Sequence, residues 1–341
     1  MMGRIAELDA LRGIAAVSVM LYHFTHFLPI LFPETGGLGW SVSWGCYGVQ
    51  AFFAVSGFVI LMTLDSTTSA GDFIVSRFSR LFPAYWAAMA VTLSIIGWFG
   101  PAKLHADGPT ILVNLTMLQT YFGALGVDGA YWSLAVELAF YVIMLGLWRL
   151  RLLDRIEAVL PLWIAVRWMG LFIPSLSDRL DLFLITDHIP YFAIGLLAYR
   201  IWSGKRTLIQ QMPIFAVAYL SVYKFDPSEP TVAFLCVCAL MPLLAAGKLS
   251  ALRHPILLWV GSISYPLYLV HQNAGYAVIL QLRAAGVSLG AAIILAVVQA
   301  FVLAILIHVT VEKPALSWIR DRWRNRDRNK TAPAMELSTA I

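Results

Sequence analysis

Long apolar stretches separated by short polar segments make up most of the chain between residues 10 and 312. A helix needs roughly 20 apolar residues to cross the hydrocarbon core of a bilayer, so stretches of this length indicate membrane-spanning helices. The pattern therefore predicts an all-α integral membrane protein with ten transmembrane helices. These helices are expected at 10–31, 46–65, 81–100, 131–148, 156–174, 183–201, 210–224, 231–247, 254–273 and 288–312.

Two apolar segments need separate interpretation. Residues 110–122, which read TILVNLTMLQTYF, are too short for an ordinary span and predict an interfacial or re-entrant segment. The first apolar stretch contains aromatic residues and two histidines, and it lacks a small-x-small cleavage site before Pro33. We therefore expect it to be a retained helix and not a secretory signal peptide.

The composition supports membrane insertion. Hydrophobic residues make up 60% of the chain and charged residues only 13%, whereas a soluble domain typically carries about 25% charged residues. The polar residues are therefore too few to cover a water-facing globule.

The net charge of +5 raises the question of nucleic-acid binding, but the basic residues lie between apolar stretches and in the C-terminal tail. With the N-terminus in the cytoplasm, 19 of the 24 Lys and Arg residues fall in inner segments and 4 in outer loops. This bias follows the positive-inside rule, so we expect both termini in the cytoplasm and no nucleic-acid partner.

The tail is strongly basic, since residues 320–330 read RDRWRNRDRNK. Such a run suits contact with the anionic lipids of the inner leaflet, or it is simply the solvated end of the last helix. We therefore expect a polytopic transmembrane domain at 1–319 and a basic cytoplasmic tail at 320–341, with membrane lipid as a partner.

Ionisable side chains inside predicted spans are costly and mark candidate functional sites. Arg12 and His23 are eleven residues apart, which is about three helical turns and a rise of roughly 16 Å on one helix face. This spacing suits an anionic molecule held at Arg12 with its reactive group at His23. A membrane-edge anchor and a packed histidine would give the same pattern. Ionisable residues inside the predicted spans include His23, His26, Glu137, Arg167, Asp187, His188, His271 and His308.

A carboxylate at the depth of His23 comes from the fourth predicted span. His23 lies about 20 Å from the inner end of its helix and Glu137 about 9 Å below the outer end of its own, in a core about 30 Å thick. A carboxylate near an imidazole fixes its tautomer and stabilises the imidazolium. We therefore predict His23 and Glu137 as catalytic residues, although depth does not determine which way the helices face.

Other polar groups are less specific. Arg77 and Arg80 share a helix face at the cytoplasmic edge, which suits phosphate binding but also follows from topology alone. His26 lacks further ligands for a metal, so we expect no metal site. Arg167 and Asp187 form a buried pair or line the site, and the sequence leaves both interpretations open.

Five separated motifs together resemble the membrane-bound acyltransferase-3 family over nearly the whole chain. In chain order they are ELDALRGIAAVSVMLYHF, YGVQAFFAVSGFVI, RFSRLFPAYW, YWSLAVELAFY and SISYPLYLVH. The resemblance implies ten transmembrane helices in a bacterial inner membrane. It also implies transfer of an acyl group, which we expect to be acetyl, from cytoplasmic acyl-CoA to a sugar hydroxyl. The expected acceptor is a cell-surface glycan such as exopolysaccharide or lipopolysaccharide, or a lipid-linked oligosaccharide precursor.

The resemblance also implies roles for particular residues. The family's essential first-helix arginine and histidine match Arg12 and His23, and its cytoplasmic R-x-x-R motif matches Arg77 and Arg80. We expect the three arginines to bind acyl-CoA. The W-S-L-x-x-E motif ends on Glu137, and we expect substrate contacts from Tyr131, Trp132, Ser133 and His271. Some relatives carry an additional hydrolase-like domain, which we do not expect in this chain.

Two questions stay open at this stage. His23 could act as a general base or carry the acyl group covalently, and both routes use the same residue. A transporter or flippase for an anionic solute is the alternative function, because it would also have many helices and a basic entrance. Transporters often contain two repeated halves, and no such repeat is visible.

Overall fold

The computed structural model describes residues 5–226 and 229–336, and all regular structure within these ranges is helical. Five helices are long and apolar enough to cross a membrane, and a sixth span results if the bent pair Pro174–Leu184 and Ile189–Trp202 counts as one. The five are Ala6–Leu31, Ser43–Asp65, Ala70–Phe99, Gly129–Arg149 and Leu289–Arg326. The predicted all-α class is confirmed, while the number of ten spans stays a prediction.

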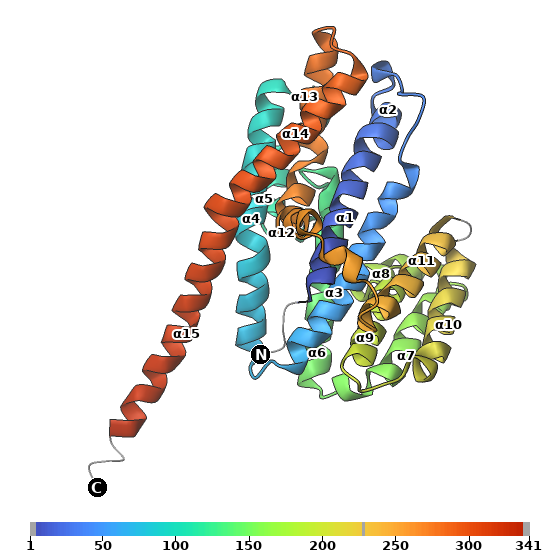
Figure 1. Cartoon of the computed structure of the whole chain (residues 1–341), viewed down its shortest axis with the longest axis vertical. Coiled ribbons are helices and arrows are strands. Elements are labelled where there is room, and N and C mark those ends of the chain that lie inside the picture. The colour runs from blue at the N-terminus through green and yellow to red at the C-terminus, as the bar shows by residue number, and fades with distance from the viewer. Residues whose placement is uncertain (1–4, 227–228, 337–341) are drawn as a thin grey trace.

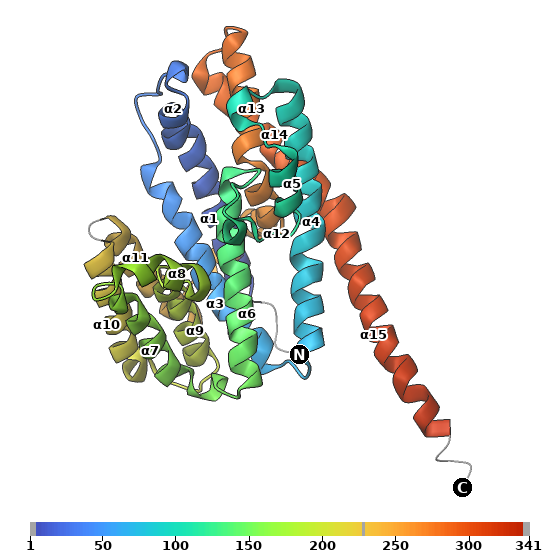
Figure 2. The same ribbon diagram turned by 180° about the vertical axis from the view of Figure 1, so that it is seen from behind.

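The helices form two groups (Figures 1 and 2). A tall bundle contains α1 (Ala6–Tyr22), α3 (Gly48–Asp65), α4 (Ala70–Phe99), α6 (Trp132–Arg149), α12 (Pro255–Val270), α13 (Gln272–Ala284) and α14 (Leu289–Ile307). A shorter group lies to one side and contains α7 (Ile156–Met169), α8 (Pro174–Leu184), α9 (Ile189–Trp202), α10 (Leu208–Phe225) and α11 (Glu229–Ala245). Contacts of α9 with α3 join the two groups.

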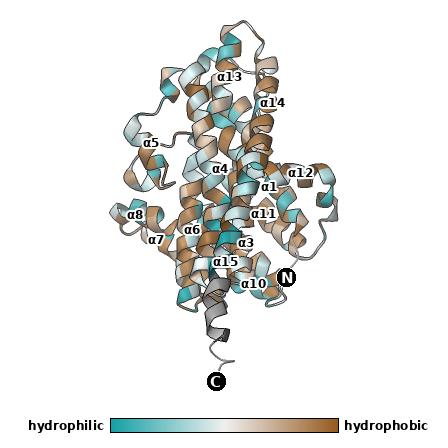
Figure 3. Cartoon of the chain, turned by 90° about the vertical axis from the view of Figure 1, so that its left-hand side faces the viewer, coloured by the Kyte–Doolittle hydropathy of each residue, from teal (hydrophilic) through white to brown (hydrophobic). Residues whose placement is uncertain are grey.

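The apolar surface of α14 illustrates why these helices belong in lipid. Figure 3 shows this helix as mainly hydrophobic, and Ile294, Leu295, Val298 and Val302 are exposed along it. In water such a surface would drive aggregation, whereas the hydrocarbon core of a bilayer solvates it.

Several boundaries differ from the predicted ones. Helix α4 begins at Ala70 and not at 81, because the Ser69 hydroxyl caps it by accepting a bond from the Asp72 amide at 3.1 Å. Residues 274–287 were predicted as part of an outer loop, but most of them belong to helix α13, which packs on α14. Helix α8 lies between the predicted spans 156–174 and 183–201 and overlaps one end of each. Residues 110–122 overlap the short helix α5 (Gly108–Asn114), which is consistent with a segment too short to span the membrane.

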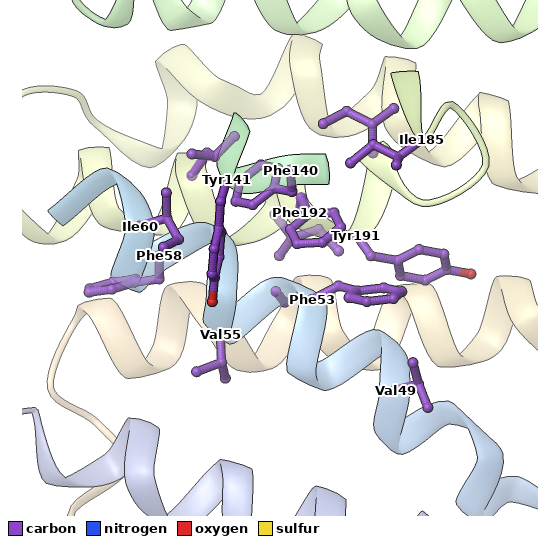
Figure 4. Close-up of a cluster of buried hydrophobic side chains, with 14 of the residues drawn as sticks. Val49, Phe53, Val55, Phe58, Ile60, Phe140, Tyr141, Ile185, Tyr191 and Phe192 are labelled. Atoms are coloured by element: carbon purple, nitrogen blue, oxygen red, sulfur yellow. The ribbon is translucent and has the colours of Figure 1, made fainter. Parts of the chain in front are cut away.

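Aromatic packing forms the centre of the joint between α3, α6 and α9. The rings of Phe53 and Phe192 stack with centroids 4.7 Å apart, and those of Phe192 and Phe140 stack at 4.0 Å. Figure 4 shows these three side chains together, with Tyr141 directed away from them towards Val55. Burial of large aromatic groups in this arrangement fixes α6 against α3, on which the site described below depends.

Helices α1 and α12 approach each other most closely at two glycines. A Cβ atom on Gly13 would lie 2.7 Å from the backbone nitrogen of Gly261, and one on Gly261 would lie 2.2 Å from the carbonyl oxygen of Asp9. Small residues permit such close backbone contact between membrane helices, where dispersion forces drive association. The crossing is therefore fixed by residues that lack a side chain.

We expect the Gly261→Ala substitution to destabilise the protein, by about 1–3 kcal/mol as for other overpacked cores. The new methyl group meets backbone atoms, which cannot rotate away. Gly146→Ala in α6 is the matched control, because nothing lies within 4 Å of that position and alanine favours a helix over glycine by about 1 kcal/mol. Thermal unfolding in detergent should show a lower Tm for Gly261→Ala only. Equal Tm values for the two variants would contradict the close crossing.

Candidate active site

The crossing of α1 and α12 also determines where two histidines meet. His23 follows Gly13 by ten residues, and His271 follows Gly261 by ten residues. Equal offsets of about 15 Å along two parallel helices bring the side chains to the same height. Nδ1 of His23 lies 2.9 Å from Nε2 of His271, and the ring centroids are 5.0 Å apart.

The surroundings of His271 determine which nitrogen of each neutral ring carries a proton. His271 is fully buried, and its Nδ1 lies 2.8 Å from the carbonyl oxygen of Tyr268 and 3.3 Å from that of Leu267. Carbonyl oxygens only accept hydrogen bonds, so Nδ1 of His271 donates and Nε2 is its acceptor. Nδ1 of His23 must then donate to His271. The lone pair of His23 is consequently on Nε2, which is free to accept a proton.

A change in helix type occurs at His23. Residues His23–Phe27 form a π-helical turn in which the Leu28 amide donates to the His23 carbonyl, and the Tyr276 hydroxyl donates to the same oxygen at 3.3 Å. Such turns are rare and are frequently found at functional sites. His26 is not part of the histidine pair, and its Nδ1 lies 3.2 Å from the Ser41 hydroxyl.

A narrow cavity lies between α1, α3, α4, α6 and α12. Along α3 its lining extends from Val49 to Val59, which corresponds to roughly 15 Å at 1.5 Å per residue. Arg12, Arg77 and Arg80 line it together. Residues far apart in the sequence thus surround one elongated space with a concentration of positive charge.

Glu137 lies in this cavity and is held by two hydroxyl groups. Ser56 donates to its Oε1 at 2.7 Å, and Tyr141 donates to the same atom at 2.6 Å. Glu137 and His23 were predicted as catalytic residues at a similar depth in the membrane. In the structure the hydrogen-bond partners of Glu137 are Ser56 and Tyr141, and the ring of His23 has His271 as its partner. Depth along a helix was estimated, but the direction in which each helix faces was not.

Phe52 and Tyr268 form part of the cavity wall beside the histidine pair. Both line the cavity, and their rings meet edge to face with centroids 5.4 Å apart. The Tyr268 ring also lies 5.6 Å from that of His271. The Tyr268 hydroxyl forms a 2.7 Å hydrogen bond with the hydroxyl of Ser133, another cavity residue. One aromatic side chain therefore contacts both the cavity and the histidine that orients His23.

The basic end of the cavity is anchored by the last helix. Nη1 of Arg80 lies 2.6 Å from Oε1 of Glu312, and Oε2 of Glu312 lies 2.6 Å from Nδ1 of His308. His308–Glu312 form a second π-helical turn, after which the chain continues as α15 (Lys313–Glu336). The Arg77 guanidinium lies over the rings of Phe73 and Tyr141. Each arginine is thus held at the cavity by a different kind of contact.

A protein-family model for an acyltransferase domain matches residues 5–312. The chain belongs to this acyltransferase family. The resemblance that the five motifs indicated is therefore confirmed, and the protein is an enzyme that transfers acyl groups. The transporter alternative has no support from the family.

Several known proteins are similar to most of this chain. The putative peptidoglycan O-acetyltransferase YrhL of Bacillus subtilis is 27% identical, over 91% of this chain and 54% of its own length. The exopolysaccharide production protein ExoZ of Rhizobium meliloti is 27% identical, over 89% of this chain and 98% of its own length. Nodulation protein 10 of Rhizobium leguminosarum is 27% identical, over 77% of this chain and 81% of its own length. The chain thus spans about half the length of YrhL, and no solved structure matches it.

The predicted substrate residues of the acyltransferase occupy different environments. Ser133 lines the cavity, whereas Tyr131 is fully buried and donates from its hydroxyl to the Leu269 carbonyl at 3.2 Å. Trp132 is 42% exposed. Its ring lies 5.5 Å from that of His188, which in turn lies 5.3 Å from the ring of Phe53 in the cavity wall.

A buried arginine joins two partly exposed aspartates near this region. Arg167 binds Asp187 at 2.7 Å through Nε and Asp226 at 2.8 Å through Nη1. The pairing of Arg167 with Asp187, which the sequence left open, is therefore present, and it includes an aspartate from a third helix end. Asp187 and His188 follow Ile185, a β-branched residue in the left-handed region with φ of 48°. This strained turn ends α8 and starts α9.

The structure brings together most of the predicted site residues and adds others. Arg12, Arg77, Arg80, Ser133 and Glu137 share the cavity, while His23 and His271 form the adjacent pair. The sequence analysis did not single out Tyr268 or Glu312, although each belongs to a polar pattern within an apolar helix, which could have indicated a role. Among the described residues, no group of three or more His, Cys, Asp or Glu side chains could hold a metal ion.

Proposed function

We propose that this acyltransferase moves an acetyl group from cytoplasmic acetyl-CoA, or another acyl-CoA, to a sugar hydroxyl of a cell-surface glycan. The acceptor would be an exopolysaccharide, a lipopolysaccharide or a lipid-linked precursor. The observation that carries the proposal is the cavity with three arginines next to the histidine pair. The relatives named for peptidoglycan O-acetylation and exopolysaccharide production support a glycan acceptor.

The donor would bind with its nucleotide at the three arginines of the cavity. Arg12, Arg77 and Arg80 would bind the phosphates of coenzyme A, because guanidinium groups match phosphate oxygens in charge and geometry. The thin pantetheine arm would then extend along α1. The rise from Arg12 to His23 is roughly 16 Å at 1.5 Å per residue, which is a suitable length for that arm and its thioester. Only the arm enters the apolar interior, so the polyanionic nucleotide stays at the cytoplasmic edge.

The chemistry would take place at Nε2 of His23. As a general base it accepts the proton of the acceptor hydroxyl while the hydroxyl oxygen attacks the thioester carbonyl. The C–S bond then breaks, and the thiolate takes up the proton to give free coenzyme A. His271 accepts the Nδ1 hydrogen throughout and holds the ring in the required tautomer. This role differs from the predicted substrate contact, because His271 is fully buried with both nitrogens engaged.

Covalent catalysis by His23 uses the same nitrogen and predicts a different time course. An acyl-imidazole intermediate would release coenzyme A in a burst before acceptor is added, whereas direct transfer requires the acceptor. Glu137 would act on the donor side in both cases, since it lines the cavity with Arg12.

The acceptor would approach from the opposite side. Trp132 is partly exposed, with His188 against it and the carboxylate of Asp187 nearby in the chain. Aromatic faces with neighbouring polar groups suit sugar rings.

We also propose that the protein lies in a bacterial inner membrane with ten spans and both termini in the cytoplasm. In this arrangement residues 1–319 form the transmembrane domain and 320–341 the basic tail.

Turnover of acetyl-CoA by purified protein in nanodiscs tests this function. We expect coenzyme A release that depends on a glycan acceptor, and a KM for acetyl-CoA that rises about tenfold in Arg80→Gln, since a charge-assisted hydrogen bond is lost. The KM for the acceptor should not change. Absence of acetyl-CoA turnover with every glycan of the host envelope would contradict the proposed donor or acceptor.

A further inference from the structure

The last helix reaches the basic end of the cavity from outside the predicted transmembrane domain. Helix α15 continues α14 and packs against α4, and its far end stands clear of the bundle (Figure 1). Two hydrogen bonds join α15 to α4. Trp323 donates to Asp72 at 2.8 Å, and Nη2 of Arg320 donates to the Ser76 hydroxyl at 3.2 Å.

Three guanidinium groups converge at this contact. The Ser76 hydroxyl also accepts from Nη2 of Arg77 at 3.2 Å. Arg77 and Arg80 of α4 are charged neighbours of Arg320, as is Arg324 of its own helix. Like charges at close range repel, and partial burial reduces the screening by water. Such a cluster is therefore typical of a site that an anion neutralises.

Two of the three arginines have no acidic partner within the described part of the chain. The ion pair found there joins Arg80 to Glu312, while Arg77 and Arg320 share one neutral hydroxyl. Nε of Arg77 is buried and has no hydrogen-bond partner. A buried guanidinium nitrogen without an acceptor is costly, so an oxyanion supplied by a ligand would satisfy it.

We propose that Arg320 binds coenzyme A together with Arg77 and Arg80, so that α15 forms one wall of the nucleotide site. This inference rests on the proposed acyl-CoA donor. Coenzyme A carries a diphosphate and a separate 3′-phosphate, and such a ligand needs more cationic groups than the two of the R-x-x-R motif. Arg320 provides a further guanidinium group from α15, where it shares the Ser76 hydroxyl with Arg77. The beginning of the basic tail is then part of the donor site.

An anionic phospholipid headgroup presents the same phosphate chemistry to α15. Arg322 provides the control for this alternative, because it lies two residues further on the same helix and is exposed. Its guanidinium lies over the ring of Trp318, 4.4 Å from the centroid. Removing either arginine changes the charge of the tail equally, but only Arg320 belongs to the cluster.

Binding of adenosine 3′,5′-bisphosphate and KM for acetyl-CoA should be measured for Arg320→Gln and Arg322→Gln in nanodiscs. One set of nanodiscs contains only zwitterionic lipid and the other contains anionic lipid. We expect Arg320→Gln to raise the Kd for the bisphosphate and the KM for acetyl-CoA about tenfold in both lipids. This is the effect of losing a charge-assisted hydrogen bond. Arg322→Gln should remain close to the wild type. Arg320→Lys should fall between them, because it keeps the charge and loses the fork.

Three results would overturn the inference. These are equal losses in the two glutamine variants, a loss restricted to anionic nanodiscs, or wild-type binding by a folded Arg320→Gln protein. Thermal unfolding of each variant shows whether it is folded. Failure of the proposed function is separable, since a wild-type protein that binds the bisphosphate but never consumes acetyl-CoA would keep this site and lose its proposed donor reaction.

Discussion

Replacement of His23 by alanine is expected to reduce acetyl transfer by about 10³-fold, the range typical for loss of a general base. Nε2 of His23 is the nitrogen whose lone pair remains after the tautomers of the pair are assigned. Without it, neither proton transfer nor an acyl-imidazole is available. Single-turnover measurement of coenzyme A release with saturating acetyl-CoA and acceptor provides the rate.

His26→Ala is the matched control for this experiment. His26 lies three residues further along the same π-helical turn, but it faces the Ser41 hydroxyl and not His271. We expect its rate to stay within a few-fold of the wild type, as for a residue outside the chemistry. Full activity of a folded His23→Ala protein would remove both the base and the covalent route.

The second large effect is expected at His271, which acts as a positioning residue. His271→Leu removes the acceptor for the Nδ1 hydrogen of His23, so the neutral ring can rotate or change tautomer. Loss of a group that orients a metal-binding histidine typically reduces metal affinity or activity 10–100-fold. By analogy, we expect kcat to fall by about 10²-fold with the KM for acetyl-CoA unchanged. The cavity in which we propose that the donor binds does not include His271.

A conservative variant separates positioning from simple damage to the fold. His271→Gln places an amide oxygen close to the position of Nε2, where it can accept from His23. Its kcat should therefore exceed that of His271→Leu by several-fold, at similar thermal stability. A rise in donor KM in His271→Leu, or equal kcat values for the two variants, would show that the pair does not control His23.

The different standing of the site residues follows from what each pattern records. Arg77 and Arg80 were predicted together because three-residue spacing places two side chains on one helix face, and both line the cavity. Arg320 was assigned to a tail by composition. Its position beside Arg77 depends on α14 continuing without a break into α15. Hydropathy alone ends the helix where the apolar residues end.

The sequence by itself determined that this chain is a helical membrane protein of the acyltransferase family, because apolar length and separated motifs are properties of the order of residues. It also determined that His23 and Arg12 share a face of one helix, since a helix has a fixed period. Only the tertiary structure decided that His23 pairs with His271 and that Glu137 accepts from Ser56 and Tyr141. Those pairings depend on how helices rotate and cross, and the crossing at Gly13 and Gly261 is a contact between residues 248 positions apart. Such contacts arise from packing between helices, which local periodicity does not encode.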